Sequence, residues 1–227
     1  MLTTVATSGF LRQFMEMIQV TERDEKILMA LVLKVRLFSQ RQIANHWWNG
    51  DVANARRRLR QLTADHLVSR VTVPVRALSP LTKPMLCWEP GDARPNADSI
   101  AYRLKRRLRN RPIRSVTAWV ATERSGQLFG GRCRGELKHR VQATHDLGVS
   151  GILLHFDACL PQWAEAWQGE DLLAHTRRGE KLPDAFIVDA ASNNVVCVIE
   201  FGGDYDARRI HEFHADCVDR DLPYQLW

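Results

Sequence analysis

Leu182-Pro183-Asp184-Ala185-Phe186-Ile187-Val188-Asp189, followed by Val195-Val196-Cys197-Val198-Ile199-Glu200-Phe201-Gly202-Gly203, decides the fold of the C-terminal half of this chain. The two runs are rich in Val and Ile and are separated by residues 190–194, a pattern that predicts a β-hairpin. Asp184 begins the first strand and Glu200 ends the second, so antiparallel pairing brings their carboxylates together. Two acids at one end of a buried sheet repel each other and lose hydration energy unless a cation lies between them. The hairpin therefore predicts a site for Mg²⁺ or Mn²⁺, which prefer oxygen ligands. The alternative is that both acids simply end strands at a solvent-exposed edge.

The composition is that of a folded protein. The chain has 227 residues, of which 45% are hydrophobic and 26% are charged, values that allow a packed core and argue against disorder. It has no apolar run of about 18 residues, so we expect no membrane span. The N-terminus lacks the basic start and apolar run of a signal peptide, and the five cysteines form no CxxC pair. These features predict a cytoplasmic protein with reduced thiols.

Charge is distributed unevenly along the chain. Residues 1–114 hold 21 Lys and Arg against 9 Asp and Glu, a net charge of +12, whereas residues 115–227 hold 11 against 17, a net charge of −6. A basic half joined to an acidic half indicates a module that binds a polyanion beside one that gathers carboxylates. For a cytoplasmic protein, the expected polyanion is double-stranded DNA.

Residues 21–73 predict three helices followed by a strand. Capping-box patterns at Thr21 and Ser39 begin the first two helices, and Asn49-Gly50 forms the turn before a third helix over about 51–65. This order looks like a winged helix-turn-helix, in which the last helix lies in the major groove of DNA. Val52 and the leucines of the third helix are expected to face the core. The residues expected to point outward, to bases and phosphates or merely to water, are Asn54, Arg56, Arg57, Arg58, Arg60 and Gln61.

A Pro-rich linker and a basic helix follow over residues 76–114. Seven basic residues and no acid lie between positions 101 and 114. An apolar stripe that begins at Ile100 would dock this helix, and its arginines would track DNA phosphates. The arginines chosen for this role are Arg103, Arg106 and Arg107.

Residues 115–227 alternate between predicted strands and helices. We expect a strand over 116–120, a helix over 132–147, a strand over 151–156 and a helix carrying Trp163 and Trp167. The hairpin, a helix over 206–218 and an edge strand over 222–227 complete the pattern. This alternation predicts an α/β sandwich of about a hundred residues. The chain is therefore expected to be α/β in its second half and α+β overall.

The hairpin resembles that of the PD-(D/E)xK nuclease superfamily, in which an aspartate and a glutamate bind the metal. Pro183-Asp184 matches the first element and Glu200 the second, but the lysine position of the pattern is Gly202. The resemblance implies a restriction-endonuclease-like core over residues 115–227, after a winged helix-turn-helix over 1–75 and the linker over 76–114. His145-Asp146 lies upstream of the hairpin, where MobC-type conjugative relaxases carry a His-acid signature. The whole chain is thus similar to the related plasmid replication-relaxation family.

This resemblance implies a DNA-binding protein of a plasmid or other mobile element that nicks DNA at a specific site. Asp184 and Glu200 would hold Mg²⁺ or Mn²⁺, and His145 or Arg209 would contact the scissile phosphate. Glu136 is expected at the start of a helix, either as a third metal ligand or as a favourable charge at the helix N-terminus. Plasmid transfer or replication proteins are the implied protein partners, and a homodimer is compatible with the pattern. The alternative function is a catalytically inactive DNA-binding accessory or regulator, which Gly202 favours.

Overall fold

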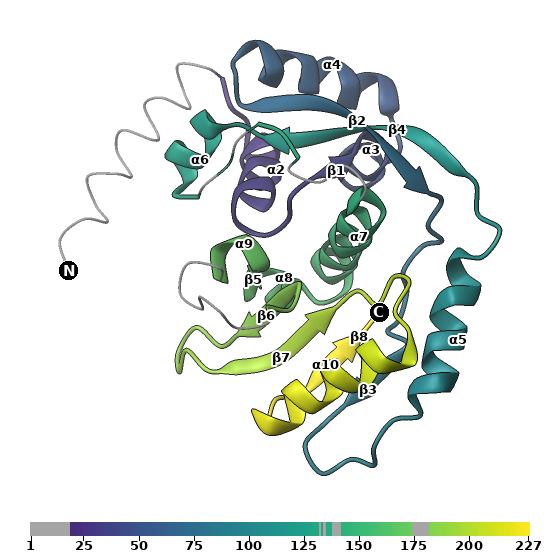
Figure 1. The fold of residues 1–227 in the computed structure, drawn as a ribbon. Helices are drawn as coiled ribbons and strands as arrows, with labels where there is room; N and C mark the ends of the chain where they lie inside the picture. The colour runs from purple at the N-terminus through teal and green to yellow at the C-terminus, as the bar shows by residue number, and fades with distance from the viewer. Residues whose placement is uncertain (1–18, 132, 134, 138–141, 174–181) are drawn as a thin grey trace. The chain divides into compact units, whose positions relative to one another are not determined.

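A computed structural model describes residues 19–131, 133, 135–137, 142–173 and 182–227 (Figure 1). The chain divides into two compact units, one formed by residues 1–71 and 118–137 and the other by 72–117 and 138–227. Two of the three boundaries fall within strands β2 (Val68–Arg76) and β4 (Ile113–Ala121), and the third follows residue 137. The units divide the chain differently from the consecutive segments 1–75, 76–114 and 115–227, because the last of these contributes to both units.

The first unit is mainly helical. It contains α2 (Glu22–Leu33), α3 (Gln40–Trp47), α4 (Val52–Ala64) and α6 (Glu123–Phe129). The predicted capping boxes are confirmed, since the side chains of Thr21 and Ser39 accept hydrogen bonds from the backbone three residues later. The short strand β1 (Phe38–Ser39) pairs antiparallel with β4, and the strand order of this sheet is β1-β4-β2.

The second unit is built on a mixed sheet with the strand order β3-β8-β7-β6-β5. The strands are β3 (Leu86–Trp88), β5 (Trp167–Gly169), β6 (Ala185–Val188), β7 (Val195–Glu200) and β8 (Tyr224–Leu226). The predicted hairpin is confirmed: β6 and β7 pair antiparallel, with Ala185 opposite Ile199. The prediction of an edge strand at the C-terminal end is wrong, because β8 lies between β7, to which it is parallel, and β3.

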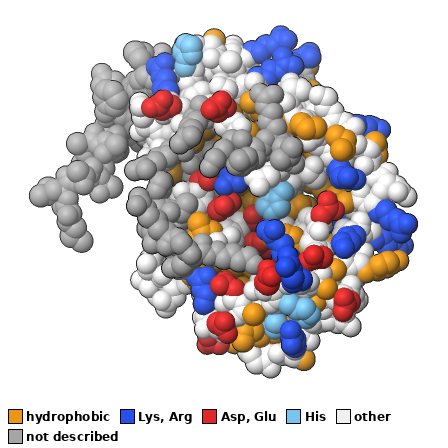
Figure 2. All heavy atoms as spheres, in the orientation of Figure 1, with side chains coloured by type: hydrophobic (Ala, Val, Ile, Leu, Met, Phe, Trp, Pro, Cys, Tyr) orange, Lys and Arg blue, Asp and Glu red, His pale blue; other side chains and the backbone are white. Residues whose placement is uncertain are grey.

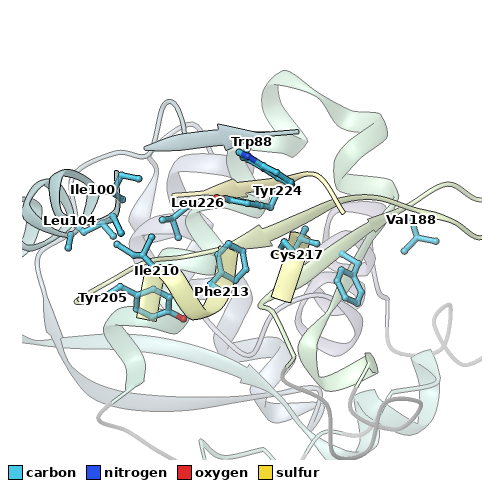
Figure 3. Packing of buried hydrophobic residues seen from close by; sticks show 14 residues of the cluster. Trp88, Ile100, Leu104, Val188, Tyr205, Ile210, Phe213, Cys217, Tyr224 and Leu226 are labelled. Atoms are coloured by element: carbon cyan, nitrogen blue, oxygen red, sulfur yellow. The ribbon is translucent and has the colours of Figure 1, made fainter. Parts of the chain in front are cut away.

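Helices cover both faces of this sheet. Helices α5 (Ala97–Leu108) and α10 (Ala207–Asp219) pack on the face that carries Phe186, Val198 and Tyr224 (Figure 3). On the other face, Phe156 of α7 (Ala143–Cys159) contacts Trp167, which lies opposite Ile187. Short helices α8 (Pro161–Glu165) and α9 (Glu170–Leu173) flank β5. The expected mixture of helices and strands is therefore confirmed.

Two predictions near α7 are wrong. Of the predicted helix over 132–147, the described residues 133 and 135–137 are not helical, whereas the residues from Ala143 onward are; positions 132, 134 and 138–141 lie outside the described residues. The predicted strand over 151–156 is the middle of α7. Trp163 is helical as expected, but Trp167 lies in β5. Among the described helices, none is long and apolar enough to cross a bilayer.

Candidate functional site

The structure brings Asp184 and Glu200 together at one end of the hairpin. Asp184 immediately precedes β6 and Glu200 is the last residue of β7, and their exposed fractions are only 8% and 5%. The backbone N–H of Asp184 donates to Glu200 Oε2 at 3.1 Å, and the N–H of Phe201 donates to Asp184 Oδ2 at 2.7 Å. The predicted proximity is confirmed, and the alternative of a solvent-exposed edge is wrong.

His145 supplies positive charge to this acid pair. Its Nε2 lies 3.4 Å from Asp184 Oδ1, and its Nδ1 lies 3.7 Å from Asp146 Oδ1. Burial by itself lowers the pKa of His145, but the nearby carboxylates, Asp184 foremost, outweigh burial and raise this pKa to about 9. An imidazolium therefore faces the acids at neutral pH. His145 was expected at the end of a helix and instead lies in the first turn of α7.

Tyr205 and Arg209 complete the cluster on the other side of Glu200. The Tyr205 hydroxyl donates to Glu200 Oε1, and the Arg209 guanidinium carbon lies 4.4 Å from the centroid of the Tyr205 ring. Burial, and then repulsion by Asp184, raise the pKa of Glu200 above its ordinary value. Burial and the neighbouring Glu200 likewise raise the pKa of Tyr205. The cluster thus holds protons tightly, on the imidazole, on the phenol and within the acid pair.

Close packing at two glycines fixes this arrangement. A Cβ atom added to Gly202 would lie 2.6 Å from Leu104 Cδ1, so the lysine position of the nuclease pattern is filled by a leucine from α5. A Cβ atom added to Gly148 would lie 2.5 Å from Cζ of Phe201, which lets the first turns of α7 approach the end of β7. A side chain at position 202 would therefore require Leu104 to move, and the described cationic residues that act on the acids are His145 and Arg209.

Arg107 was missed as a neighbour of Phe201, the residue that follows Glu200 in the chain. Its guanidinium carbon lies 4.8 Å from the centroid of the Phe201 ring, and its Nη2 donates to the main-chain oxygen of Trp227 at 3.0 Å. Burial lowers its pKa, and its Nε is buried without a hydrogen-bond partner in the described structure. Arg103 and Arg106 are exposed as predicted, whereas Arg107 is half-buried. No sequence signal links Arg107 to Phe201, because the contact joins positions far apart in the chain.

The acid pair suits a hard divalent cation in its chemistry. Asp184 and Glu200 present carboxylate oxygens, and backbone N–H groups orient both side chains, as outer-shell partners orient metal ligands. Glu136, the predicted third ligand, is exposed in a bend of the first unit and not on a helix. Within the described ranges, no group of three or more His, Cys, Asp and Glu side chains is arranged to hold a metal ion. Among the described residues, Asp184 and Glu200 are therefore the carboxylates that would hold an ion at this site.

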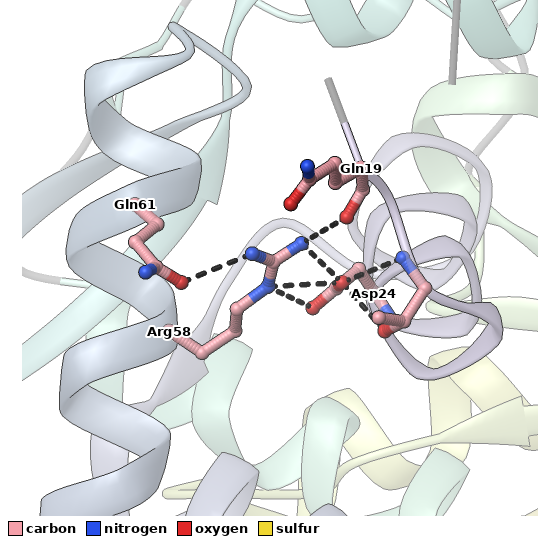
Figure 4. A network of polar contacts seen from close by, with 5 residues as sticks. Gln19, Asp24, Arg58 and Gln61 are labelled. Atoms are coloured by element: carbon pink, nitrogen blue, oxygen red, sulfur yellow. Dashed lines mark hydrogen bonds and ion pairs between the residues drawn. The ribbon is translucent and has the colours of Figure 1, made fainter. Parts of the chain in front are cut away.

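Part of the α4 face that was predicted to bind DNA instead makes contacts within the protein. Arg58 is half-buried, and its Nη2 lies 2.7 Å from Oδ2 of Asp24, a fully buried acid of α2 (Figure 4). The same guanidinium donates to Gln61 Oε1 at 3.0 Å and to the main-chain oxygen of Gln19 at 2.7 Å. Arg58 therefore joins α4 to α2, with Gln61 of its own helix as a further acceptor, and the expectation that Arg58 points to solvent is wrong.

The remaining predicted residues of α4 lie on its surface. Asn54, Arg56, Arg57 and Arg60 are exposed, and Lys and Arg side chains gather over α4 and along α5 (Figure 2). Asn54 also donates to the side chain of Asp51, the N-cap of α4. Val52 was expected in the core, but 42% of it is exposed, because it precedes the first buried turn of the helix.

No family model, curated protein or solved structure matches this chain. Inference about function therefore depends on the residues and the geometry described above.

Proposed function

We propose that this chain is a DNA-binding protein of a plasmid or other mobile element, and that it nicks DNA with a divalent metal ion held by Asp184 and Glu200. The observation that carries the proposal is the buried acid pair with an imidazolium beside it. Burying two carboxylates is unfavourable unless positive charge compensates them, and a strand end needs no such pair. Strongly perturbed pKa values in one cluster are typical of functional sites.

The first unit supports the DNA-binding part of the proposal. Helices α2, α3 and α4 are followed by β2 in the order of a winged helix-turn-helix, and β2 belongs to a sheet with β4 and β1. The basic side chains that α4 exposes are Arg56, Arg57 and Arg60, which suit phosphates and guanine edges. Arg58 is left out of this surface because Asp24 holds it.

The second unit supports the nicking part. The main elements of this unit are compatible with the nuclease-like core that the resemblance implies. They are a helix, three antiparallel strands, a second helix and a parallel strand, in the order α7-β5-β6-β7-α10-β8. Asp184 and Glu200 would hold the ion, which activates water and offsets the charge of a phosphodiester under attack. His145 would neutralise a phosphate oxygen beside Asp184. Arg209, held over the Tyr205 ring, would do the same on the side of Glu200.

A second candidate function is a DNA-binding accessory without nuclease activity. One observation favours it: Leu104 fills the space of the lysine that would otherwise assist the attacking water. In that case, His145 would compensate the charge of the acid pair permanently, Tyr205 would donate a hydrogen bond to Glu200, and the second unit would act as a scaffold.

Calorimetric titration of Mn²⁺ and a nicking assay on supercoiled plasmid separate the two functions. The variants are Asp184→Asn, which keeps the shape of the side chain, and Asp189→Asn, which changes an exposed acid in the hairpin turn. We expect the wild type and Asp189→Asn to bind Mn²⁺ and nick, and Asp184→Asn to lose both properties. If the wild type binds plasmid but neither Mn²⁺ nor Mg²⁺ and does not nick, the accessory function is correct. Nicking that survives Asp184→Asn would place the chemistry elsewhere.

A further inference from the structure

A basic groove lies on the second unit, apart from the acid pair itself. Residues 80–85 form one wall, and α5 forms the other, around a volume of about 440 Å³. Lys83, Arg103, Arg106 and Arg107 line it together with apolar residues that include Pro84 and Met85. Among the described residues that line the groove, none is acidic. Its positive charge and partly apolar floor suit a ligand with an anionic backbone and less polar groups attached to it.

Tyr102 lies on the exposed surface of α5, next to the arginines that line the groove. It has an exposed fraction of 63%, which is high for an aromatic side chain. It lies one helical turn before Arg106, and the two residues differ by about 40° around the helix axis. Arg103 and Arg107 follow in the same rotational direction, so the aromatic ring and the arginines form one continuous face. Aromatic side chains on which bases stack, beside a positively charged groove, are the features of proteins that bind single-stranded nucleic acid.

Arg107 connects the groove to Phe201, the residue that follows Glu200. Its guanidinium packs on the ring of Phe201, whose backbone N–H donates to Asp184 Oδ2. The hydrogen bond to Trp227 fixes the guanidinium, while the buried Nε has no partner in the described structure. The inner end of the groove therefore lies beside Phe201.

We propose that this groove binds a single strand of nucleic acid. Lys83, Arg103 and Arg106 contact its phosphates, Tyr102 stacks on one of its bases, and Arg107 receives a phosphate at the inner end. The inference deepens the proposed function and rests on it for the identity of the polyanion: the first unit recognises duplex DNA, and the groove retains one strand near the acid pair.

Fluorescence anisotropy with labelled oligodeoxythymidine of about 12 nucleotides, a length within the range of single-strand sites, tests the proposal on the full chain. We expect Tyr102→Ala to weaken binding by roughly 5- to 100-fold and Tyr102→Phe to bind as the wild type, because stacking needs the ring and not the hydroxyl. Arg106→Gln is expected to weaken binding and to reduce the slope of log K against log salt by about 0.7. Equal affinities of wild type and Tyr102→Ala would overturn the proposal.

A duplex hairpin and the variant Arg57→Gln provide the matched controls. We expect Arg57→Gln to weaken binding of the duplex and to leave oligodeoxythymidine binding unchanged, and Tyr102→Ala to show the reverse. Thymidine monophosphate serves as a competitor: if it competes as well as the oligonucleotide, the groove is a mononucleotide site and the strand proposal is wrong. Absence of nicking would contradict the proposed nuclease and would leave these binding results intact, so the two failures are distinguishable.

Discussion

At the scale of single residues, His145 is the most informative side chain of the acid cluster. Asp184 lies 3.4 Å from its Nε2 and Asp146 lies 3.7 Å from its Nδ1, so protonated imidazole is bound from both sides. Because the folded-state pKa of about 9 exceeds the ordinary value of 6.5, His145 stabilises the fold fully below pH 6.5. This contribution is lost as the pH rises through 9. The raised pKa of Glu200 also makes the stability of the fold decrease as the pH rises.

We therefore predict that the His145 imidazole titrates near pH 9. Heteronuclear NMR of the imidazole nitrogens across a pH series measures this directly. In Asp184→Asn the titration is expected to move toward ordinary values, because its main electrostatic partner is lost. His214 is the internal control: burial and nearby cations lower its pKa, so it should titrate on the opposite side of 6.5. Titration of His145 near 6.5 in both proteins would contradict the ion pair.

Sequence reasoning found the acid pair and, through the family resemblance, His145 and Arg209, but not the packing around them. The approach of Asp184 to Glu200 follows from hairpin pairing, which is local and readable in the sequence. The placement of His145 depends on where α7 begins, and the exclusion of a side chain at Gly202 depends on Leu104, nearly a hundred positions away. Such contacts are set by tertiary packing, and no spacing rule predicts them.

At the scale of elements, the ion pair between α2 and α4 determines which arginines are structural. Arg58→Ala would leave Asp24 charged, fully buried and without its partner, and we predict a loss of about 3–5 kcal/mol in the free energy of unfolding. Arg57→Ala removes an exposed arginine from the preceding position and should change stability by about 0.5 kcal/mol or less. Urea denaturation of both variants measures the difference. Equal stabilities would show that solvent, and not Arg58, compensates Asp24.

Helices and strands were predicted well where their ends carry side-chain signals. Thr21, Ser39, Asp51 and Asp206 each accept a hydrogen bond at a helix N-terminus, and the predicted starts of these helices are confirmed. Helix α7 has no side-chain cap at its N-terminus and is buried along much of its length. Its apolar run over 151–156 therefore shows no amphipathic period, and a short buried helix segment cannot be told from a buried strand on that basis.

At the scale of the whole molecule, the uneven charge supports the proposed binding of DNA. Residues 1–114 carry a net charge of +12, and α4 exposes arginines on a helix that the ion pair to α2 holds in place. A protein that neutralises DNA phosphates releases condensed counterions. The logarithm of its binding constant for duplex DNA therefore falls linearly with the logarithm of the salt concentration, with a slope of about −0.9 per phosphate contact. A high net charge alone would also make DNA affinity fall with salt. The contribution of individual basic residues must therefore be tested.

We predict that Arg57→Gln reduces the magnitude of this salt slope by about 1, because one phosphate contact is lost. Lys26→Gln is the matched control: it removes the same charge from α2, where the exposed Lys26 pairs with Glu22 at 2.9 Å. Equilibrium binding of a duplex, measured over a series of salt concentrations, should show the wild-type slope for Lys26→Gln and the smaller slope for Arg57→Gln. Equal effects of the two variants would mean that DNA senses the net charge of the chain and not a surface on α4. A reduced slope confined to Arg57→Gln would place a phosphate at the N-terminal half of this helix, as docking in a major groove requires.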